Sequence, residues 1–177
     1  MRRLGVAFTQ EAPQVDESAR PGETAVALAL RLSLDKARAI AARHPDALVV
    51  GSDQVALLDG RLVGKPGTTE AACEQLARAS GRSVEFLTAV SLVDARSGSH
   101  RSAVDRTTVR FRLLAAAEIA RYVDRERPLD CAGSFKSEAL GIALFESLET
   151  KDPTALIGLP LILLCELLRS AGLDPLA

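Results

Sequence analysis

A run of apolar residues, Leu48-Val49-Val50, followed at once by Gly51-Ser52-Asp53, is the feature that most restricts the fold of this chain. Such a run predicts a buried strand that delivers a carboxylate to the rim of a sheet, where α/β proteins keep their ligand sites. The sequence then turns through Asp59-Gly60, a pair typical of tight hairpins, and reaches a Gly64-Lys65-Pro66 corner. We therefore expect Asp53 and Lys65 to face one cleft.

Helical and extended patterns alternate along the rest of the chain. Apolar residues recur at helical spacing between Glu23 and Arg43, at Val26, Leu30, Leu34, Ala37 and Ile40 or Ala41, without an intervening proline. Besides the strand and hairpin already described, we predict helices over 23–43, 68–80, 115–125 and 159–170 and strands over 6–8, 83–93, 101–112 and 142–148. This alternation indicates the α/β class, and the long hairpin over 83–112 makes the sheet at least partly antiparallel.

The second strand of that long hairpin has a strict two-residue period. One face holds Asp105, Thr107, Val109, Phe111 and Leu113, and the other holds Arg106, Thr108, Arg110 and Arg112. Because successive side chains of a strand point to opposite faces, the sequence predicts one buried face and one strongly basic face.

Charge and composition favour a small ligand over a polymer or a membrane. The 22 basic and 23 acidic residues leave a net charge of -1, which provides no field for non-specific binding of nucleic acid or membrane. Five Phe, one Tyr and no Trp are too few for a surface that stacks single-stranded bases. The longest apolar run, over 159–165, is too short to cross a bilayer. Three widely spaced cysteines indicate reduced thiols in a cytoplasmic protein.

Familiar nucleotide-binding and hydrolase motifs are absent. The segment from Gly60 to Pro66 looks like a P-loop but has one residue too few between its glycines, and Pro66 replaces the Ser or Thr that would hold magnesium. A scattered set of carboxylates and lysines remains: Glu17, Lys36, Asp53, Lys65, Lys136 and Glu138. Each alone is better explained as a cap, a turn former or a solvated charge. Together they suit magnesium-assisted phosphate chemistry, which needs hard oxygen ligands and fixed cations.

Several ordered motifs give the chain a resemblance to a known family. The motifs are Gly51-Ser52-Asp53-Gln54-Val55, Gly64-Lys65-Pro66, Thr107-Thr108-Val109, Ser134-Phe135-Lys136-Ser137-Glu138 and Ile157-Gly158-Leu159-Pro160. In order and spacing they resemble the Maf family of nucleoside triphosphate pyrophosphatases, over nearly the whole chain. The resemblance implies a single domain, 1–177, with a twisted mixed sheet flanked by helices, two lobes and a central nucleotide cleft.

The resemblance also implies roles for four charged residues. It makes Asp53 and Lys65 catalytic residues, with Asp53 as the proton acceptor. Glu17 and Lys36 would line the phosphate and metal site, and the carboxylates of Asp53 and Glu17 would bind a divalent cation, Mg²⁺ or Mn²⁺. A metal-activated water would then attack the α-phosphorus and release pyrophosphate.

Two further positions carry the implied base specificity, Gln54 and Glu138. The Gly-Ser-Asp-Gln and Ser-Phe-Lys-Ser-Glu variants resemble the subfamily that hydrolyses 7-methyl-GTP to 7-methyl-GMP, a reaction that would clear a modified nucleotide from the pool. An ionised Glu138 only accepts hydrogen bonds, so it suits the N1–H and amino edge of guanine.

One departure leaves other functions open. The family begins with a strand and a Ser-x-Ser-x-x-Arg loop that supports the phosphates, and this sequence begins after that loop, so we expect an N-terminally truncated chain. The alternatives are a catalytically impaired nucleotide-binding or regulatory protein linked to septum formation or division arrest, and a pyrophosphatase of broader range. A homodimer is open by analogy with the family alone.

Overall fold

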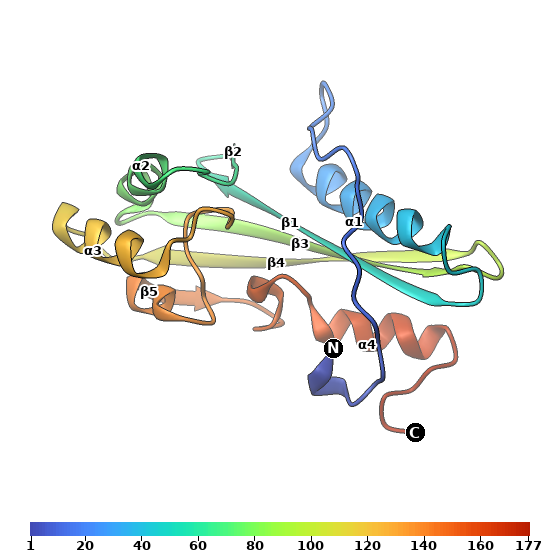
Figure 1. The fold of residues 1–177 in the computed structure, drawn as a ribbon. Coiled ribbons are helices and arrows are strands. Elements are labelled where there is room, and N and C mark those ends of the chain that lie inside the picture. Colours follow the sequence, from blue (N-terminus) through green and yellow to red (C-terminus); the bar gives the residue numbers. More distant parts are fainter.

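The computed structural model describes residues 1–177, and a five-stranded sheet forms its centre (Figure 1). The strands are β1 (Leu48–Leu58), β2 (Arg61–Val63), β3 (Ser83–Asp94), β4 (His100–Phe111) and β5 (Phe145–Glu149), in the spatial order β2-β1-β3-β4-β5. Every neighbouring pair is antiparallel, so the expectation of a mixed sheet is wrong. β2 and β3 run in the same direction, but β1 lies between them and prevents a parallel pairing.

Four helices pack on this sheet, and all four were predicted: α1 (Ala25–Ala41), α2 (Thr69–Ala79), α3 (Ala116–Glu126) and α4 (Leu161–Ser170). At one end of the long strands, α1 packs Leu28 against Leu87 on one face, and α4 packs Leu164 against Val90 on the opposite face. At the other end, α2 and α3 enclose the largest core cluster around Phe86 (Figure 1). None of the helices has the length and apolarity needed to span a bilayer.

Local sequence explains where these elements begin and turn. Thr24 and Thr68 are the N-caps of α1 and α2. Each hydroxyl accepts a hydrogen bond from the backbone N–H three residues further along the chain. Asp59 and Gly60 join β1 to β2 with φ angles of 51° and 73°, the left-handed geometry that the strand twist of a hairpin prefers. The predicted hairpin is thereby confirmed.

The two-residue period of β4 is confirmed, but its basic face is not a free field of charge. Thr107 and Phe111 are fully buried. On the exposed face, Arg106 pairs with Glu85 and Arg110 pairs with Glu146. Leu113 is 83% exposed because it lies beyond the end of the strand. These arginines therefore form surface ion pairs, and such pairs carry little net charge to attract a polyanion.

Three segment predictions need correction. Residues 6–8 form no strand, and the chain there is irregular. The predicted strand over 142–148 is a 3-10 helix over Leu140–Leu144 followed by β5, which begins at Phe145. β1 does not end at Asp53 but continues to Leu58, so Asp53 lies in mid-strand. The apolar run alone did not show where β1 ends, because β1 pairs with β3 along its whole length.

Candidate active site

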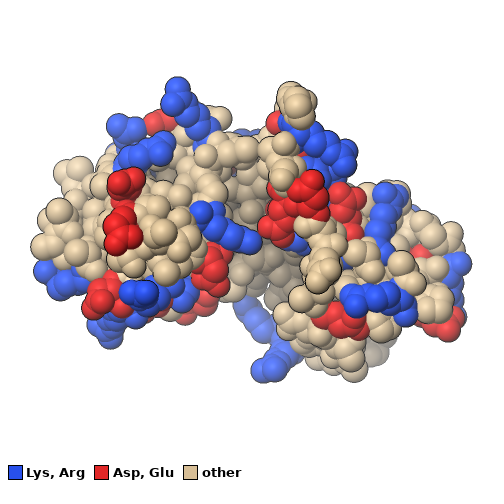
Figure 2. Space-filling model, turned by 45° about the horizontal axis from the view of Figure 1, so that its top comes forward, with Lys and Arg blue, Asp and Glu red and all other residues tan.

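A cavity of about 280 Å³ lies beside the middle of β1 and is lined by side chains from five segments. Figure 2 shows the surface hollowed between the two groups of helices, with acidic and basic side chains on its margins. The lining includes Lys36 of α1, Asp53 and Gln54 of β1, Lys65 after β2, and Glu138 in the loop before β5, together with parts of 130–137 and 156–158. Lys136 also lines it, so the structure brings six of the seven candidate residues to one cavity.

The pairing of β1 explains how adjacent residues reach the same cavity. β2 pairs with β1 only over Ala56–Leu58, so Leu48–Val55 pairs with β3 alone and leaves one strand edge unpaired. Asp53 lies opposite Ala89 on the face that α1 covers, whereas Gln54 lies opposite Thr88 on the other face. Both side chains reach the cavity around the unpaired edge. The sequence predicted a site at the end of this strand, whereas the structure places it at the side of the strand.

A chain of ion pairs connects four of the predicted charged residues, and the last of them, Lys65, is exposed to solvent. Lys36 Nζ lies 2.5 Å from Asp53 Oδ1 and 2.7 Å from Glu17 Oε1. Lys65 Nζ is 3.4 Å from Glu17 Oε2, with its side chain 62% exposed. Glu17 does not line the cavity itself but contacts two lysines that do. Asp53, at 11% side-chain exposure, is the most enclosed of these groups.

Burial and the lysine act in opposite directions on Asp53. Burial raises the pKa of the Asp53 carboxyl, and the hydrogen bond from Lys36 opposes that rise. The pKa of Lys36 is raised, because its hydrogen bonds to Asp53 and Glu17 outweigh the burial of the ammonium. The same ammonium lowers the pKa of Glu17 through a hydrogen bond. A raised pKa makes Asp53 a stronger proton acceptor than a solvated carboxylate.

Gly51 explains how α1 comes close enough to place Lys36 on Asp53. A Cβ at Gly51 would lie 2.2 Å from Ser33 O and 2.7 Å from Ala37 N, both backbone atoms of α1. Only glycine leaves room for this approach. The glycine of the Gly-Ser-Asp motif thus sets the distance between the helix and the strand, which in turn sets the ion pair.

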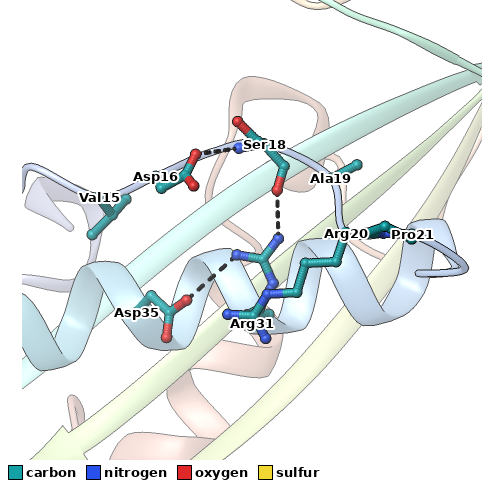
Figure 3. Close-up of a pocket in the computed structure, with 8 residues that line it drawn as sticks. All are labelled: Val15, Asp16, Ser18, Ala19, Arg20, Pro21, Arg31 and Asp35. Atoms are coloured by element: carbon teal, nitrogen blue, oxygen red, sulfur yellow. Dashed lines mark hydrogen bonds and ion pairs between the residues drawn. The ribbon is translucent and has the colours of Figure 1, made fainter.

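The loop that carries Glu17 is attached to α1 by Arg31. Its guanidinium donates to Glu23 Oε1 at 2.7 Å and to Ser18 O at 2.9 Å, and it lies 3.5 Å from Asp35 Oδ2. A second, larger cavity of about 410 Å³ lies beneath this loop (Figure 3), and none of the predicted site residues lines it. The contacts of Arg31 to Ser18, next to Glu17, hold the loop in reach of Lys36.

Packing also fixes the loop that bears Glu138. Phe135 makes edge-to-face contacts with three other phenylalanines at centroid distances of 4.9 to 5.7 Å. Ser134, with a φ of 60°, donates a 2.6 Å hydrogen bond to Gln75. Lys136 is turned back, and its Nζ donates to the carbonyl of Glu126 at 2.7 Å. Glu138 remains on the cavity wall without a salt bridge.

Sequence reasoning missed Thr88 and gave no role in the site to Ser52 or to residues 155–158, although Ser52 and residues 157–158 lie in motifs noted above. Ser52 Oγ lies 2.7 Å from both Ala89 O and Gly158 O, and Thr88 contacts Gln54 and Ala155 O. These contacts attach residues 155–158 to β1 and β3. Ser52 belongs to a motif that was noted, but Thr88 looks like an ordinary β-branched strand residue, so no sequence signal identifies it.

The carboxylates of Asp53 and Glu17 fit a divalent cation whose remaining ligands are phosphate oxygens of a substrate. No group of three His, Cys, Asp or Glu side chains gathers anywhere in the structure. Asp53 and Glu17 nevertheless direct carboxylate oxygens toward one point, which Lys36 Nζ occupies. Mg²⁺ is commonly bound by one or two carboxylates and substrate phosphates, and such a set needs no all-protein cage.

Comparison with known proteins identifies the family of this chain. Residues 1–171 match the family model described as Maf-like protein. A protein of Aromatoleum aromaticum named 7-methyl-GTP pyrophosphatase is 56% identical over 98% of this chain and 89% of its own length. Proteins of the same name from Xanthomonas axonopodis pv. citri and Chromohalobacter salexigens are 56% and 52% identical, over 96% and 98% of this chain and 88% and 90% of their own lengths. A family match over nearly the whole sequence, together with relatives of this identity and coverage, shows that this chain belongs to the Maf family.

Proposed function

We propose that this chain hydrolyses 7-methyl-GTP to 7-methyl-GMP and pyrophosphate and so removes a modified nucleotide from the pool. The proposal is supported by the name shared by relatives more than 50% identical over nearly the whole chain. The structural observation that carries it is the Glu17–Lys36–Asp53 cluster beside a cavity that also holds Gln54 and Glu138. The nucleotide would lie in this cavity, between the two groups of helices of a single domain.

In this proposal Asp53 accepts a proton from the attacking water. The water oxygen bonds to the α-phosphorus, and the bond from that phosphorus to the oxygen that bridges to the β-phosphate breaks. Lys36 and Lys65 offset the negative charge of the phosphate oxygens. The enclosure of Asp53 raises its pKa and so strengthens it as the base, while the hydrogen bond from Lys36 opposes that rise.

Asp53 and Glu17 are the residues that would hold Mg²⁺ or Mn²⁺ together with the phosphates. The cation supplies Lewis-acid stabilisation of the phosphoryl oxygens and lowers the pKa of water. Lys36 would move its ammonium from between the carboxylates to the phosphate oxygens as the triphosphate enters. Chelation of divalent cations is therefore expected to abolish turnover.

Base recognition is assigned to Gln54 and Glu138. Guanine presents two neighbouring donors, N1–H and the 2-amino group, and N7-methylation adds positive charge to the base. The Glu138 carboxylate accepts such donors and attracts that charge. Uracil and thymine offer a single N–H between two carbonyl oxygens, and a carboxylate repels those oxygens.

The direct test measures pyrophosphate and orthophosphate release from 7-methyl-GTP, GTP, dTTP and UTP with Mg²⁺ or Mn²⁺. We expect pyrophosphate from 7-methyl-GTP, and a loss of at least about 100-fold in Asp53→Asn, because the base is removed. Asp46→Asn is the matched control, since Asp46 is 82% exposed and pairs only with Arg96 on the surface. Binding of 7-methyl-GTP without turnover would refute the enzyme and favour a nucleotide-binding protein.

A further inference from the structure

The side-chain amide of Gln54 is held in one orientation by three acceptors. Its Nε2 donates to Thr88 Oγ1 at 2.9 Å, to Ala155 O at 3.0 Å and to Leu156 O at 3.3 Å. Two of these acceptors are backbone carbonyls, which cannot donate to an amide oxygen. Reversing the amide would place oxygen against oxygen. Gln54 therefore keeps its nitrogen toward the protein and leaves Oε1, an acceptor, for the cavity that Gln54 lines.

Thr88 supplies the third acceptor for Gln54 Nε2 from the neighbouring strand, β3. It lies directly opposite Gln54 in the β1–β3 pairing, so the two side chains share one face of the sheet. The Thr88 hydroxyl has one proton, which it donates to Ala155 O at 3.0 Å. Only its lone pairs then face Gln54 Nε2. Thr88 is fully buried, does not line the cavity and cannot touch a substrate there.

We propose that Thr88 is a positioning residue for base selection, which fixes Gln54 so that its carbonyl oxygen faces the nucleobase. This inference rests on the proposed function and deepens it. With Gln54 Oε1 and the Glu138 carboxylate both accepting, the cavity wall matches a base edge that carries adjacent donors. A reversed amide would instead offer donors to the carbonyl oxygens of a pyrimidine.

Substitutions at Thr88 separate its hydroxyl from its shape. Thr88→Val keeps the branched shape and removes the hydroxyl, so Gln54 loses one acceptor and Ala155 O loses one donor. Thr88→Ser keeps the hydroxyl and removes a methyl group. Ser91→Ala is the matched control, because Ser91 is a fully buried hydroxyl of the same strand on the opposite face, opposite Gly51.

The kinetic test is the ratio of kcat/KM for 7-methyl-GTP to kcat/KM for UTP. We expect Thr88→Val to lower this ratio by about tenfold or more, since a buried polar group loses its fixed partner. Thr88→Ser and Ser91→Ala should stay within about threefold of the wild-type ratio. A purely structural role would lower activity on both nucleotides and leave the ratio unchanged, as would an effect on folding alone. An unchanged ratio in Thr88→Val, or equal losses in the Val and Ser variants, would overturn the inference.

A second measurement keeps this inference distinct from the proposed function. The ¹⁵N-labelled side-chain amide of Gln54, assigned by its absence in Gln54→Met, should show slow proton exchange in the wild type and in Thr88→Ser. It should exchange faster in Thr88→Val. If the wild-type chain does not turn over 7-methyl-GTP but the amide behaves in this way, the proposed function fails and the positioning by Thr88 stands. Equal exchange in Thr88→Val and the wild type would refute the positioning, whatever the chain hydrolyses.

Discussion

Gly51→Ala tests whether the contact between α1 and β1 controls both stability and the candidate base. Atoms in ordinary contact are 3.4 Å or more apart, and the new Cβ would lie 2.2 Å from Ser33 O. The obstacle is helix backbone, which cannot rotate away as a side chain tip can. α1 would have to retreat by about 1.2 Å, which would move Lys36 Nζ from its 2.5 Å contact with Asp53 beyond hydrogen-bond distance.

Overpacking of this kind costs about 2 to 3 kcal/mol, the upper part of the usual range, because backbone must move. For a chain of this length that lowers Tm by roughly 5 to 10 °C in a thermal unfolding scan. The kcat for pyrophosphate release should fall as well, since Lys36 would no longer hold Asp53 and the phosphates together.

Gly64→Ala is the control for this prediction. A Cβ added at Gly64 would have no atom within 4 Å, and the φ of this residue is not positive, so the new methyl group meets no obstacle. Its Tm should match or slightly exceed that of the wild type, because alanine restricts the unfolded chain more than glycine does. A Tm for Gly51→Ala equal to that of Gly64→Ala would refute the close approach of α1.

Three further predictions concern charged groups. Lys36→Met removes the cation that opposes the burial of Asp53, so the pKa of Asp53 should rise further and the acid limb of the kcat/KM profile should move to higher pH; an unmoved limb would exclude Asp53 as the base. Glu138→Gln should shift preference toward dTTP and UTP in the pyrophosphate assay, and unchanged selectivity would remove the base-reading role. Arg31 and the Arg20 amide lower the pKa of Glu23 to about 2 from 4.5, so their stabilisation is present above pH 4.5 and is lost as pH falls toward 2. Urea unfolding at pH 3 and pH 6 should therefore show a smaller loss of stability for Glu23→Gln than for the wild type, and equal losses would contradict the assignment.

Local patterns predicted the helices because the signal for each lies within the helix itself. The apolar stripe at Val26, Leu30, Leu34 and Ala37 located α1 but not its buried face. Of these residues only Ala37 is buried, whereas Leu28, Ala29 and Leu32 are the apolar residues that the helix buries toward its start. The Asp59-Gly60 turn likewise needs only its own two residues to adopt left-handed φ values. These features depend on near neighbours in the chain, so a sequence is sufficient to locate them.

The predictions that failed concern partners far away in sequence. Phe8 has the apolar, aromatic character of a strand residue, but it pairs with no strand, and the residue is 43% exposed. The mixed sheet was an implication of the family resemblance, and the position of β1 between β2 and β3 makes the sheet antiparallel throughout. The order of strands in a sheet cannot be predicted from any local sequence pattern.

The candidate site shows the same division. The residue types of Asp53 and Lys65 suggested phosphate chemistry from the sequence, and the structure places both on one cavity wall. Their roles stay predictions until variants are measured. The orientation of Gln54 depends on Thr88 and on a carbonyl of residue 155, which are 34 and 101 positions away in the chain. Contacts at such separations can be found only in three dimensions.

The unpaired edge of β1 has a consequence for how such a protein can change during evolution. Asp53 and Gln54 are consecutive in sequence, yet one belongs to the packing layer of α1 and the other to the layer that contains Thr88. A mutation that repacks one layer leaves the other nearly untouched. If Asp53 carries the chemistry and Gln54 the base selection, as proposed, the two can diverge separately, so that a lineage could acquire a new nucleobase preference and inherit its hydrolytic residues unchanged.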